Sequence, residues 1–221
     1  MIMKVLATGS TGNSYVIIDD NGNCLVIEAY MNVHTVLENT KEAKKYSGWV
    51  FSHEHSDHFL KNIAKQYDMY FGKEITEFSV FKFPLKHDFS KKWLGLTCNG
   101  FVIQTACKKS ILYLTDFYEI PEEILPELSK IKFDLIMIEC SYCNFIYKDL
   151  EPEVKERLQN HCSDDKCVNY IKQICGDRKN TKILTIHKSE RGGRAGLILS
   201  KFETNGFKNV RVAVKGSILT I

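Results

Sequence analysis

Three histidines and an aspartate are crowded into six residues of this chain, in the stretch His-Glu-His-Ser-Asp-His at positions 53–58. Neutral imidazole nitrogens and carboxylate oxygens are good ligands for divalent metal ions such as zinc. Without such a partner, titratable groups crowded in this way are costly to bury. The stretch therefore predicts a metal site, and the alternative is a polar loop whose histidines only form hydrogen bonds.

The residues before this stretch make the prediction more specific. Residues 48–51 form an apolar run that predicts a buried strand, so the chain enters the stretch in an extended conformation. Side chains two residues apart on an extended chain point the same way, which pairs His53 with His55. Asp57 and His58 are adjacent and must diverge, which indicates a second metal ion on their far side.

Four further potential ligands each follow an apolar stretch that predicts a strand. They are His87, Asp116, Glu139 and His187. Strand ends at one edge of a sandwich can bring distant side chains together on rigid supports. The pattern therefore favours one site that is assembled from several strands.

Length and composition favour one folded domain over residues 1–221. The chain is 44% hydrophobic and has a net charge of only +3, which neither requires nor excludes a nucleic-acid partner. No apolar segment suits a signal peptide or a membrane span, so we expect a cytoplasmic protein with no membrane partner and with its eight cysteines reduced. Cys140 and Cys143 have CxxC spacing and could bind a structural metal ion or remain free thiols.

Apolar periodicity and turn signals predict an interleaved order of strands and helices. The expected strands cover residues 3–7, 15–18, 24–27, 48–51, 69–71, 81–85, 94–97, 101–107, 111–115, 133–138, 182–186, 210–214 and 217–221, with a turn at 99–100 and the last two strands as a hairpin. The expected helices cover residues 33–46, 59–66, 73–78, 121–128, 164–175 and 196–203. This order fits two sheets packed face to face with helices outside.

The stretch His-x-His-x-Asp-His after a strand resembles the signature of the metallo-β-lactamase-fold hydrolases. The resemblance implies an α+β fold, an αββα sandwich of two mixed β-sheets with helices on the outer faces. Gly-Ser-Thr-Gly-Asn-Ser at positions 9–14 looks like the start of a small single-domain branch, the YycJ/WalJ-type exonucleases and their phage-borne relatives. One departure is Ile-Glu-Ala-Tyr at positions 27–30, where the family commonly has Ile-Asp-Ala/Cys-Gly. The carboxylate is one methylene longer here, and the glycine turn is lost.

The resemblance assigns the metal ligands residue by residue. One divalent metal ion is expected on His53, His55 and His87, a second on Asp57, His58 and His187, and Asp116 is expected to bridge the two. Zinc suits these ligands, and manganese or iron are alternatives. Two such ions leave the site positively charged, so a metal-bridging hydroxide formed there is expected to attack an anionic phosphodiester, with Asp57 also serving in catalysis.

Residues outside this ligand set are expected to assist the reaction. His161 lies in a His-x-Ser segment like that of the tRNA-maturation and DNA-exonuclease branches, where the histidine pairs with a glutamate like Glu139, binds phosphate and donates a proton. The alternative is that His161 only belongs to the capping region of a helix. Ser163 caps that helix and is expected to bind phosphate together with the helix N-terminus. Arg191 and Arg194 could clamp a phosphate or be solvated loop residues.

The expected function is hydrolysis of phosphodiester bonds by a dinuclear metal centre, in a nuclease or exonuclease. An alternative substrate is a small cyclic nucleotide, as in phage proteins that remove immune signals, and an alternative of another class is a non-catalytic metal-binding scaffold. A β-lactamase is disfavoured because those enzymes usually lack this second ligand set and are exported. No segment between Asp116 and His187 fits the large cap of RNA-processing relatives. A homodimer is an open alternative, since relatives often form dimers.

Overall fold

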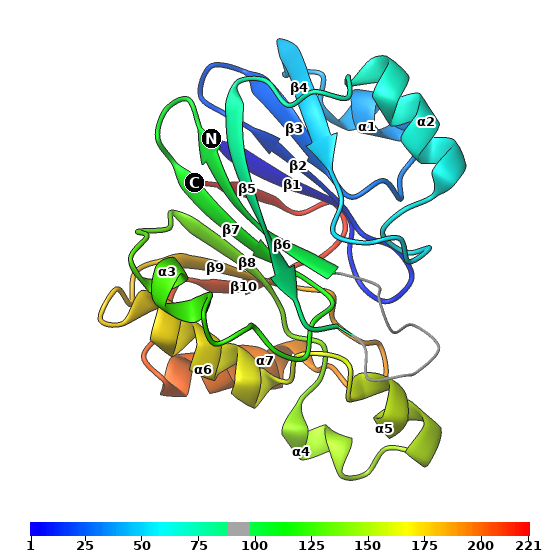
Figure 1. The fold of residues 1–221 in the computed structure, drawn as a ribbon. Helices are drawn as coiled ribbons and strands as arrows, with labels where there is room; N and C mark the ends of the chain where they lie inside the picture. The colour runs from blue at the N-terminus through cyan, green and yellow to red at the C-terminus, as the bar shows by residue number, and fades with distance from the viewer. Residues whose placement is uncertain (88–97) are drawn as a thin grey trace.

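A computed structural model describes residues 1–87 and 98–221 of the chain. Two mixed β-sheets face one another, and helices cover the outer face of each sheet (Figure 1). The α+β class and the αββα sandwich are therefore confirmed. Within the described residues, no helix combines the length and the apolar character that a membrane span requires.

The first sheet has five described strands, and among them β3 and β4 form the only parallel pair. In spatial order they are β11 (Ile218–Thr220), β1 (Ile2–Ala7), β2 (Ser14–Ile18), β3 (Asn23–Ile27) and β4 (Lys45–Val50). Helices α1 (Val33–Asn39) and α2 (Lys61–Tyr70) pack on its outer face. Strands β2 and β3 are buried along their whole length because both faces of the sheet are covered.

The second sheet has six described strands, of which β7 to β10 run parallel to one another. In spatial order they are β10 (Val210–Val212), β9 (Lys182–Ile186), β8 (Leu135–Glu139), β7 (Ser110–Leu114), β6 (Cys98–Thr105) and β5 (Phe78–Leu85). Helices α3 (Leu125–Ser129), α6 (Asp164–Cys175) and α7 (Ala195–Thr204) cover its outer face. Helices α4 (Asn144–Tyr147) and α5 (Pro152–Leu158), which the sequence did not predict, project beyond the sheets (Figure 1).

Helix α6 matches its sequence signals closely. The hydroxyl of Ser163 accepts a hydrogen bond from the backbone N–H of Lys166 at 3.3 Å, and Asp164 and Asp165 lie in the first turn, where the helix dipole favours negative charge. Gly176 ends the helix with a φ of 53°. The predicted helix at 121–128 is shorter, since only Leu125–Ser129 is helical.

Several element predictions are wrong because sheet pairing overrides local spacing. Tyr46 belongs to β4 and pairs with Cys24, so the helix predicted to reach residue 46 ends at Asn39. The expected strand at 69–71 is the end of α2 and its C-cap, and residues 73–77 form irregular bends before β5 begins at Phe78. The predicted strand at 94–97 lies outside the described residues.

Two turn predictions are also wrong. Residues 99–100 lie within β6, where a side chain on Gly100 would meet the ring of Phe83 at 2.6 Å, so the glycine serves packing and makes no turn. Residues 210–221 do not form a hairpin, because β10 pairs with β9 in the second sheet while β11 pairs with β1 in the first. The chain therefore crosses from one sheet to the other near its end.

Candidate metal centre

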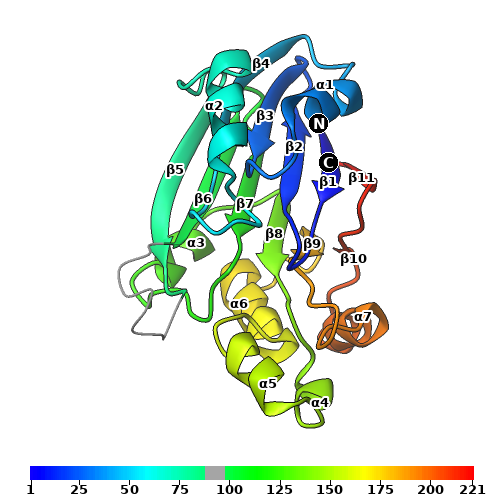
Figure 2. The same cartoon turned by 90° about the vertical axis from the view of Figure 1, so that its right-hand side faces the viewer.

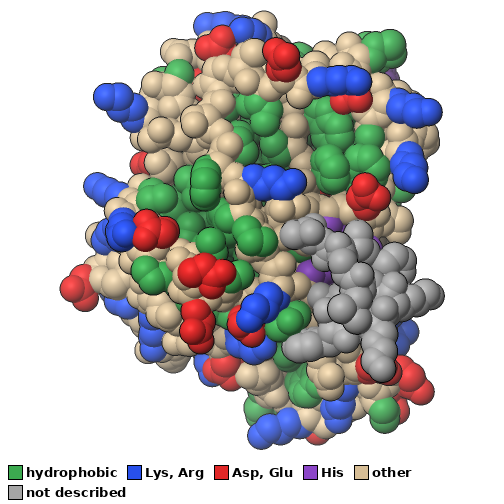
Figure 3. Space-filling model, in the orientation of Figure 1, with side chains coloured by type: hydrophobic (Ala, Val, Ile, Leu, Met, Phe, Trp, Pro, Cys, Tyr) green, Lys and Arg blue, Asp and Glu red, His purple; other side chains and the backbone are tan. Residues whose placement is uncertain are grey.

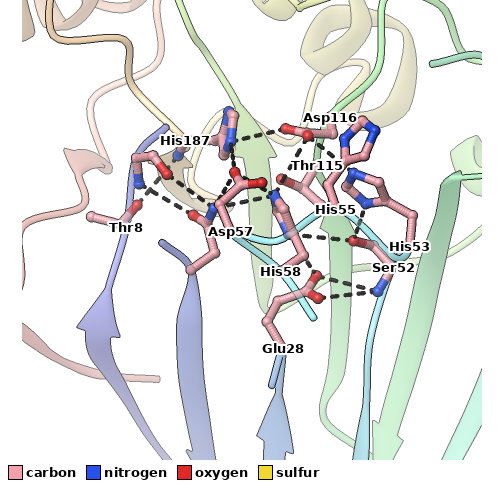
Figure 4. A network of polar contacts seen from close by, with 12 residues as sticks. Thr8, Glu28, Ser52, His53, His55, Asp57, His58, Thr115, Asp116 and His187 are labelled. Atoms are coloured by element: carbon pink, nitrogen blue, oxygen red, sulfur yellow. Dashed lines mark hydrogen bonds and ion pairs between the residues drawn. The ribbon is translucent and has the colours of Figure 1, made fainter. Parts of the chain in front are cut away.

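The predicted ligands meet where strands of both sheets end at the same edge of the sandwich. The segment after β4 carries the histidine-rich stretch, and Asp116, Glu139 and His187 lie at the ends of β7, β8 and β9. Figure 4 shows the side chains of His53, His55, Asp57, His58, Asp116 and His187 pointing toward one another from the two sheets. In the face drawn in Figure 3, histidine side chains are visible near the middle, set back from the surrounding surface.

The first group of potential ligands consists of three histidines and a carboxylate. One ligand atom from each of His53, His55, His87 and Asp116 lies within 4.8 Å of the others. The Nε2 atom of His87 is 3.2 Å from Nδ1 of His55, and Nε2 of His53 is 3.2 Å from Oδ2 of Asp116. Nitrogen atoms this close to one another need a shared proton or a shared cation between them.

The second group combines two carboxylates with two histidines. It contains Asp57, His58, Asp116 and His187, again with ligand atoms within 4.8 Å of one another. Oδ2 of Asp57 is 3.3 Å from Nε2 of His58 and 3.2 Å from Nε2 of His187. Asp116 belongs to both groups, with Oδ2 toward His53 and His58 and Oδ1 at 3.0 Å from Nε2 of His187. It therefore lies where the bridging residue was predicted.

Unsatisfied polar atoms test whether a metal ion fits this cluster. Among the described residues, Nε2 of His53, Nδ1 of His87 and Oδ1 of Asp116 are buried and form no hydrogen bond, although His53 and Asp116 make the close ion-pair contacts given above. A buried polar atom without a partner costs about 1–3 kcal/mol. Cations at the two groups would satisfy His53 and Asp116, so the cluster fits a dinuclear metal site.

The histidines of the cluster fall into two groups according to the direction in which their pKa is shifted. Burial lowers the pKa of His87 to about 4 and also lowers the pKa of His55, so both rings are neutral at pH 7. Burial opposes the charged form of His58 and His187 as well, but the nearby carboxylates, Asp116 first, outweigh it and raise the pKa of both rings. Without a metal ion, the second group is therefore held together by ion pairs.

Glu28 supports the cluster through hydrogen bonds, at a position where the family pattern that this sequence resembles commonly has an aspartate. Its side chain is fully buried, and its carboxylate accepts hydrogen bonds from the backbone N–H of Ser52 at 3.2 Å and the hydroxyl of Tyr113 at 2.8 Å. Its Oε1 is also 3.3 Å from Nδ1 of His58. The longer side chain thus orients a histidine of the second group and leaves the first group to other supports, such as the Ser52 hydroxyl at 2.9 Å from Nδ1 of His53.

Asn13 is a site residue that the sequence reasoning missed. Its amide nitrogen is 3.1 Å from Nε2 of His58 and 3.4 Å from Oδ2 of Asp57, and its backbone N–H donates to the carbonyl of Asp57 at 2.7 Å. The signal was the glycine-rich segment at 9–14: Gly9 has a φ of 117°, and the ring of Tyr30 fills the space where a side chain on Gly12 would lie.

Strained backbone is concentrated at this site. Glu28, Asp116 and His187 have φ values of 68°, 45° and 53°, in the left-handed region that non-glycine residues rarely adopt. Each follows a strand directly or after one residue, so the turn redirects the side chain from the sheet into the cluster. Such strain costs about 1–3 kcal/mol per residue and is retained mainly at functional sites.

A third group links the metal ligands to a cavity. Nδ1 of His161 is 2.6 Å from Oε1 of Glu139, and the same oxygen is 3.2 Å from Nδ1 of His187. The other carboxylate oxygen of Glu139 accepts from the backbone N–H of Phe117 at 2.9 Å. The predicted pairing of His161 with Glu139 is present, and the His161 side chain is 20% exposed, so its far edge faces the cavity.

The cavity beside His161 has a volume of about 180 Å³. It is lined by Ser10, Ser141, Val154, Arg157, Leu158, His161, His187, Ser189, Glu190 and Arg191. Arg157 was not predicted; it reaches the cavity because α5 folds back beside the loop that follows β9.

Two residues predicted to contact the substrate do not line this cavity. The Ser163 side chain is buried and its hydroxyl accepts a hydrogen bond from the backbone N–H of Lys166, so Ser163 is not among the residues that line the cavity. Phosphate binding at this helix N-terminus stays a prediction. The guanidinium of Arg194 donates to the carbonyls of Glu190, Arg191 and Gly193 and so folds onto its own loop. Of the two predicted arginines, only Arg191 lies at the cavity.

The CxxC pair remains free. All eight cysteines are free thiols, and Cys140 and Cys143 are buried. In residues 1–87 and 98–221, the groups that could hold a metal ion contain only histidine, aspartate and glutamate. The structure therefore gives no support for a structural metal ion at these cysteines.

Comparisons with known proteins give similarity at the level of the fold. No protein-family model matches the chain, and no curated protein matches it either. Solved structures do: human tRNase Z, short form, aligns over 100% of this chain and 99% of its own with a TM-score of 0.64 and 13% identity. An isothiocyanate hydrolase from Delia radicum gut bacteria aligns over 100% and 99% with a TM-score of 0.65 and 11% identity.

A third solved structure carries the name of the superfamily. It is a metal-dependent hydrolase of the β-lactamase superfamily, which aligns over 100% of this chain and 99% of its own with a TM-score of 0.51 and 11% identity. Identities this low report on architecture alone. The chain therefore has the metallo-β-lactamase fold that its His-x-His-x-Asp-His stretch led us to expect.

Proposed function

We propose that this protein is a metal-dependent hydrolase that cleaves phosphodiester bonds, most simply as a nuclease. The fold by itself does not select the reaction, because its structural neighbours include both a tRNase Z and an isothiocyanate hydrolase. The observation that supports a phosphodiester is the cavity beside His161, which Arg157 and Arg191 line from separate segments together with the predicted metal ligand His187. The narrower likeness to YycJ/WalJ-type exonucleases agrees with this choice.

The charge of the cavity suits an anion. Arg157 comes from α5 and Arg191 from the loop after β9, and neither guanidinium forms an ion pair with a carboxylate among the described residues. Glu190 is the one acidic side chain among the lining residues, and the hydroxyls of Ser10 and Ser189 add hydrogen-bond donors. Guanidinium groups bind phosphate oxygens in a bidentate manner, which a neutral amide substrate would not need.

The residues of the cluster have distinct roles in this proposal. Metal ions bound to the two ligand groups would lower the pKa of water and polarise a phosphoryl oxygen; zinc suits the ligands, and manganese or iron are alternatives. Burial would raise the pKa of Asp57, but hydrogen bonds from His187 and His58 outweigh it, so Asp57 is anionic at neutral pH and can hold a cation or orient water.

His161 is the proton donor to the leaving group. Burial opposes its protonation, but the Glu139 carboxylate outweighs this effect and raises the pKa of His161, so the doubly protonated ring persists to higher pH than in an ordinary histidine. Nδ1 of His161 is hydrogen-bonded to the Glu139 carboxylate, so the Nε2 proton lies on the ring edge that faces the cavity. An alkoxide leaving group needs this proton, whereas a nitrophenolate is stable without it.

The proposal is tested by phosphodiester hydrolysis after loading with Zn²⁺ or Mn²⁺. Bis(p-nitrophenyl) phosphate reports on the metal centre, and a dinucleotide reports on the proton donor as well. We expect Asp57→Ala to abolish both activities, and His161→Ala to reduce dinucleotide cleavage far more than nitrophenyl ester cleavage. Unchanged rates in both variants would contradict this mechanism, and no turnover with any metal would favour a non-catalytic scaffold.

A small cyclic nucleotide is the second candidate substrate. A cavity of about 180 Å³, walled by α5, encloses a phosphate and part of a sugar without requiring a long groove. Cyclic mononucleotides should therefore be compared with end-labelled single-stranded and double-stranded DNA under the same conditions. A value of kcat/KM that is higher for the cyclic substrate would select this alternative.

A further inference from the structure

A second cavity lies at the side of the sandwich where β10 and β11 part. These strands follow one another in the chain but are edge strands of different sheets, and both lie on the same side of the molecule (Figure 2). The cavity between them has a volume of about 370 Å³ and is lined by the side chains of Lys182, Lys208 and Arg211. No acidic residue is among its lining residues.

The three cations have no counter-charge of their own. Among the described residues, none of them forms an ion pair with a carboxylate, and Lys208 and Arg211 are exposed. The ammonium group of Lys182 donates to the backbone carbonyl of Thr220 at 3.0 Å, which ties β9 to β11 but leaves its charge uncompensated. A neighbouring cavity shares Lys182 and is also basic, but its lining includes the carboxylates of Asp134 and Asp177, whereas the lining of this cavity includes none.

The position of the cations relative to the metal centre is fixed by strand register. Arg211 pairs with Leu184, three residues before His187 on β9, and Lys182 is five residues before it. At about 3.3 Å per residue, the backbone positions of Arg211 and Lys182 lie roughly 10–17 Å from that of His187 along the strand direction. Stacked nucleotides rise about 3.4 Å each, so this distance corresponds to about 3–5 nucleotides.

We infer that this cavity, called here the β10–β11 basic groove, binds the sugar–phosphate backbone of a polynucleotide whose scissile bond lies at the metal centre. The inference rests on the proposed phosphodiesterase function and specifies its substrate as a polymer. Cations without partners along an edge of a nearly neutral protein match the repeated negative charge of nucleic acid. A cyclic mononucleotide bound at the metal centre would be too short to reach Lys208 and Arg211.

The test replaces Lys208 and Arg211 by glutamate and keeps Lys182, whose contact with Thr220 supports the sheets. The matched control is Lys61→Glu/Lys65→Glu, which makes the same charge change at exposed positions of α2. Substrates are bis(p-nitrophenyl) phosphate, a dinucleotide and a labelled single strand of about 12 nucleotides, longer than the distance to the groove requires. Binding of the labelled strand to metal-free protein is measured by fluorescence anisotropy across a salt series.

The expected result depends on substrate length. For the long strand, Lys208→Glu/Arg211→Glu should raise Kd and KM by about tenfold or more, and the slope of log Kd against log salt should fall by about 1.4, which is about 0.7 for each lost phosphate contact. Hydrolysis of the dinucleotide and the nitrophenyl ester should not change. The control variant should behave like the unaltered protein on all three substrates.

Failure of this inference is separable from failure of the proposed function. If the long strand does not bind, or binds equally to the unaltered protein and the groove variant, the groove does not bind nucleic acid. The same conclusion follows if the strand binds no more tightly than an acidic polypeptide measured as a control. If the strand binds through the groove but no phosphodiester is hydrolysed with any metal, the inference of binding stands and the proposed reaction is wrong.

Discussion

Nδ1 of His161 lies 2.6 Å from Oε1 of the fully buried Glu139. The same oxygen contacts Nδ1 of His187, so one carboxylate fixes both a metal-ligand histidine and the histidine at the cavity. Glu139 terminates β8 in the middle of the second sheet, which makes it a rigid support. Orientation of the proposed proton donor and orientation of the second group of potential metal ligands are therefore coupled through one side chain.

Replacing Glu139 by glutamine should separate these two roles. The amide keeps the shape but removes the charge that raises the pKa of His161, so the protonated ring is lost at a lower pH. We expect kcat for a dinucleotide to fall by about 10²–10³-fold at pH 7 and the alkaline limb of its pH profile to move to lower pH. Metal content, measured by elemental analysis, should be retained. An unshifted profile would show that Glu139 does not set the protonation of His161.

Removing the guanidinium groups at the cavity should weaken substrate binding. Arg157→Ala and Arg191→Ala should each raise KM by about tenfold or more with a smaller effect on kcat, because a charge-assisted hydrogen bond contributes about 1.5–3 kcal/mol. Arg194→Ala is the control, since that guanidinium is bound to carbonyls of its own loop. Equal effects at all three positions would indicate a general loss of loop structure instead of a binding role.

Loading the metal-free protein should release protons. The pKa values of His58 and His187 are raised well above the ordinary histidine value, so both rings are protonated at neutral pH. A metal ion that binds Nε2 of either ring must displace the proton on that atom. His87, with a pKa lowered to about 4, is already neutral and releases none. We expect release of about two protons per protein from these rings at pH 7, about one more where a metal-bound water ionises, and weaker metal binding as the pH falls. Titration calorimetry in buffers of different ionisation enthalpy measures this number, and a value near zero would contradict it.

Glu28 should matter for folding as well as for metal binding. Glu28→Ala leaves the Ser52 N–H and the Tyr113 hydroxyl without acceptors in a buried place, which should lower the free energy of unfolding by about 2–4 kcal/mol. Urea denaturation of the metal-free protein measures the loss. Tyr113→Phe removes one donor and should cost less, and the two losses should not add, because the residues share a hydrogen bond.

Two glycines provide a matched pair for packing. A side chain on Gly100 would lie 2.6 Å from the Phe83 ring and 3.0 Å from Leu114, so Gly100→Ala should destabilise the protein by about 1–3 kcal/mol. Gly196 lies in α7 with no atom near its missing side chain, so Gly196→Ala should stabilise it by up to about 1 kcal/mol. Thermal unfolding checks both, and changes of the same sign would contradict this account of β6.

The sequence by itself determined the chemistry of the site and the places where it could form. A histidine-rich stretch after an apolar strand, and single histidines and carboxylates at later strand ends, are local signals that survive without knowledge of the fold. The cap of α6 at Ser163 is local in the same way. Side-chain chemistry and short-range backbone preferences depend on residues that are close together in the sequence, so these predictions required no knowledge of distant contacts.

Only the tertiary structure decided which of these groups meet and what else joins them. Arg157 reaches the cavity because α5 folds back beside the loop after β9, and Asn13 reaches His58 because a glycine turn lets the chain approach Asp57. Residues 210–221 separate into two sheets, because β10 pairs with β9 and β11 pairs with β1. Such pairings depend on surfaces formed by residues far apart in the chain, and local periodicity carries no information about them.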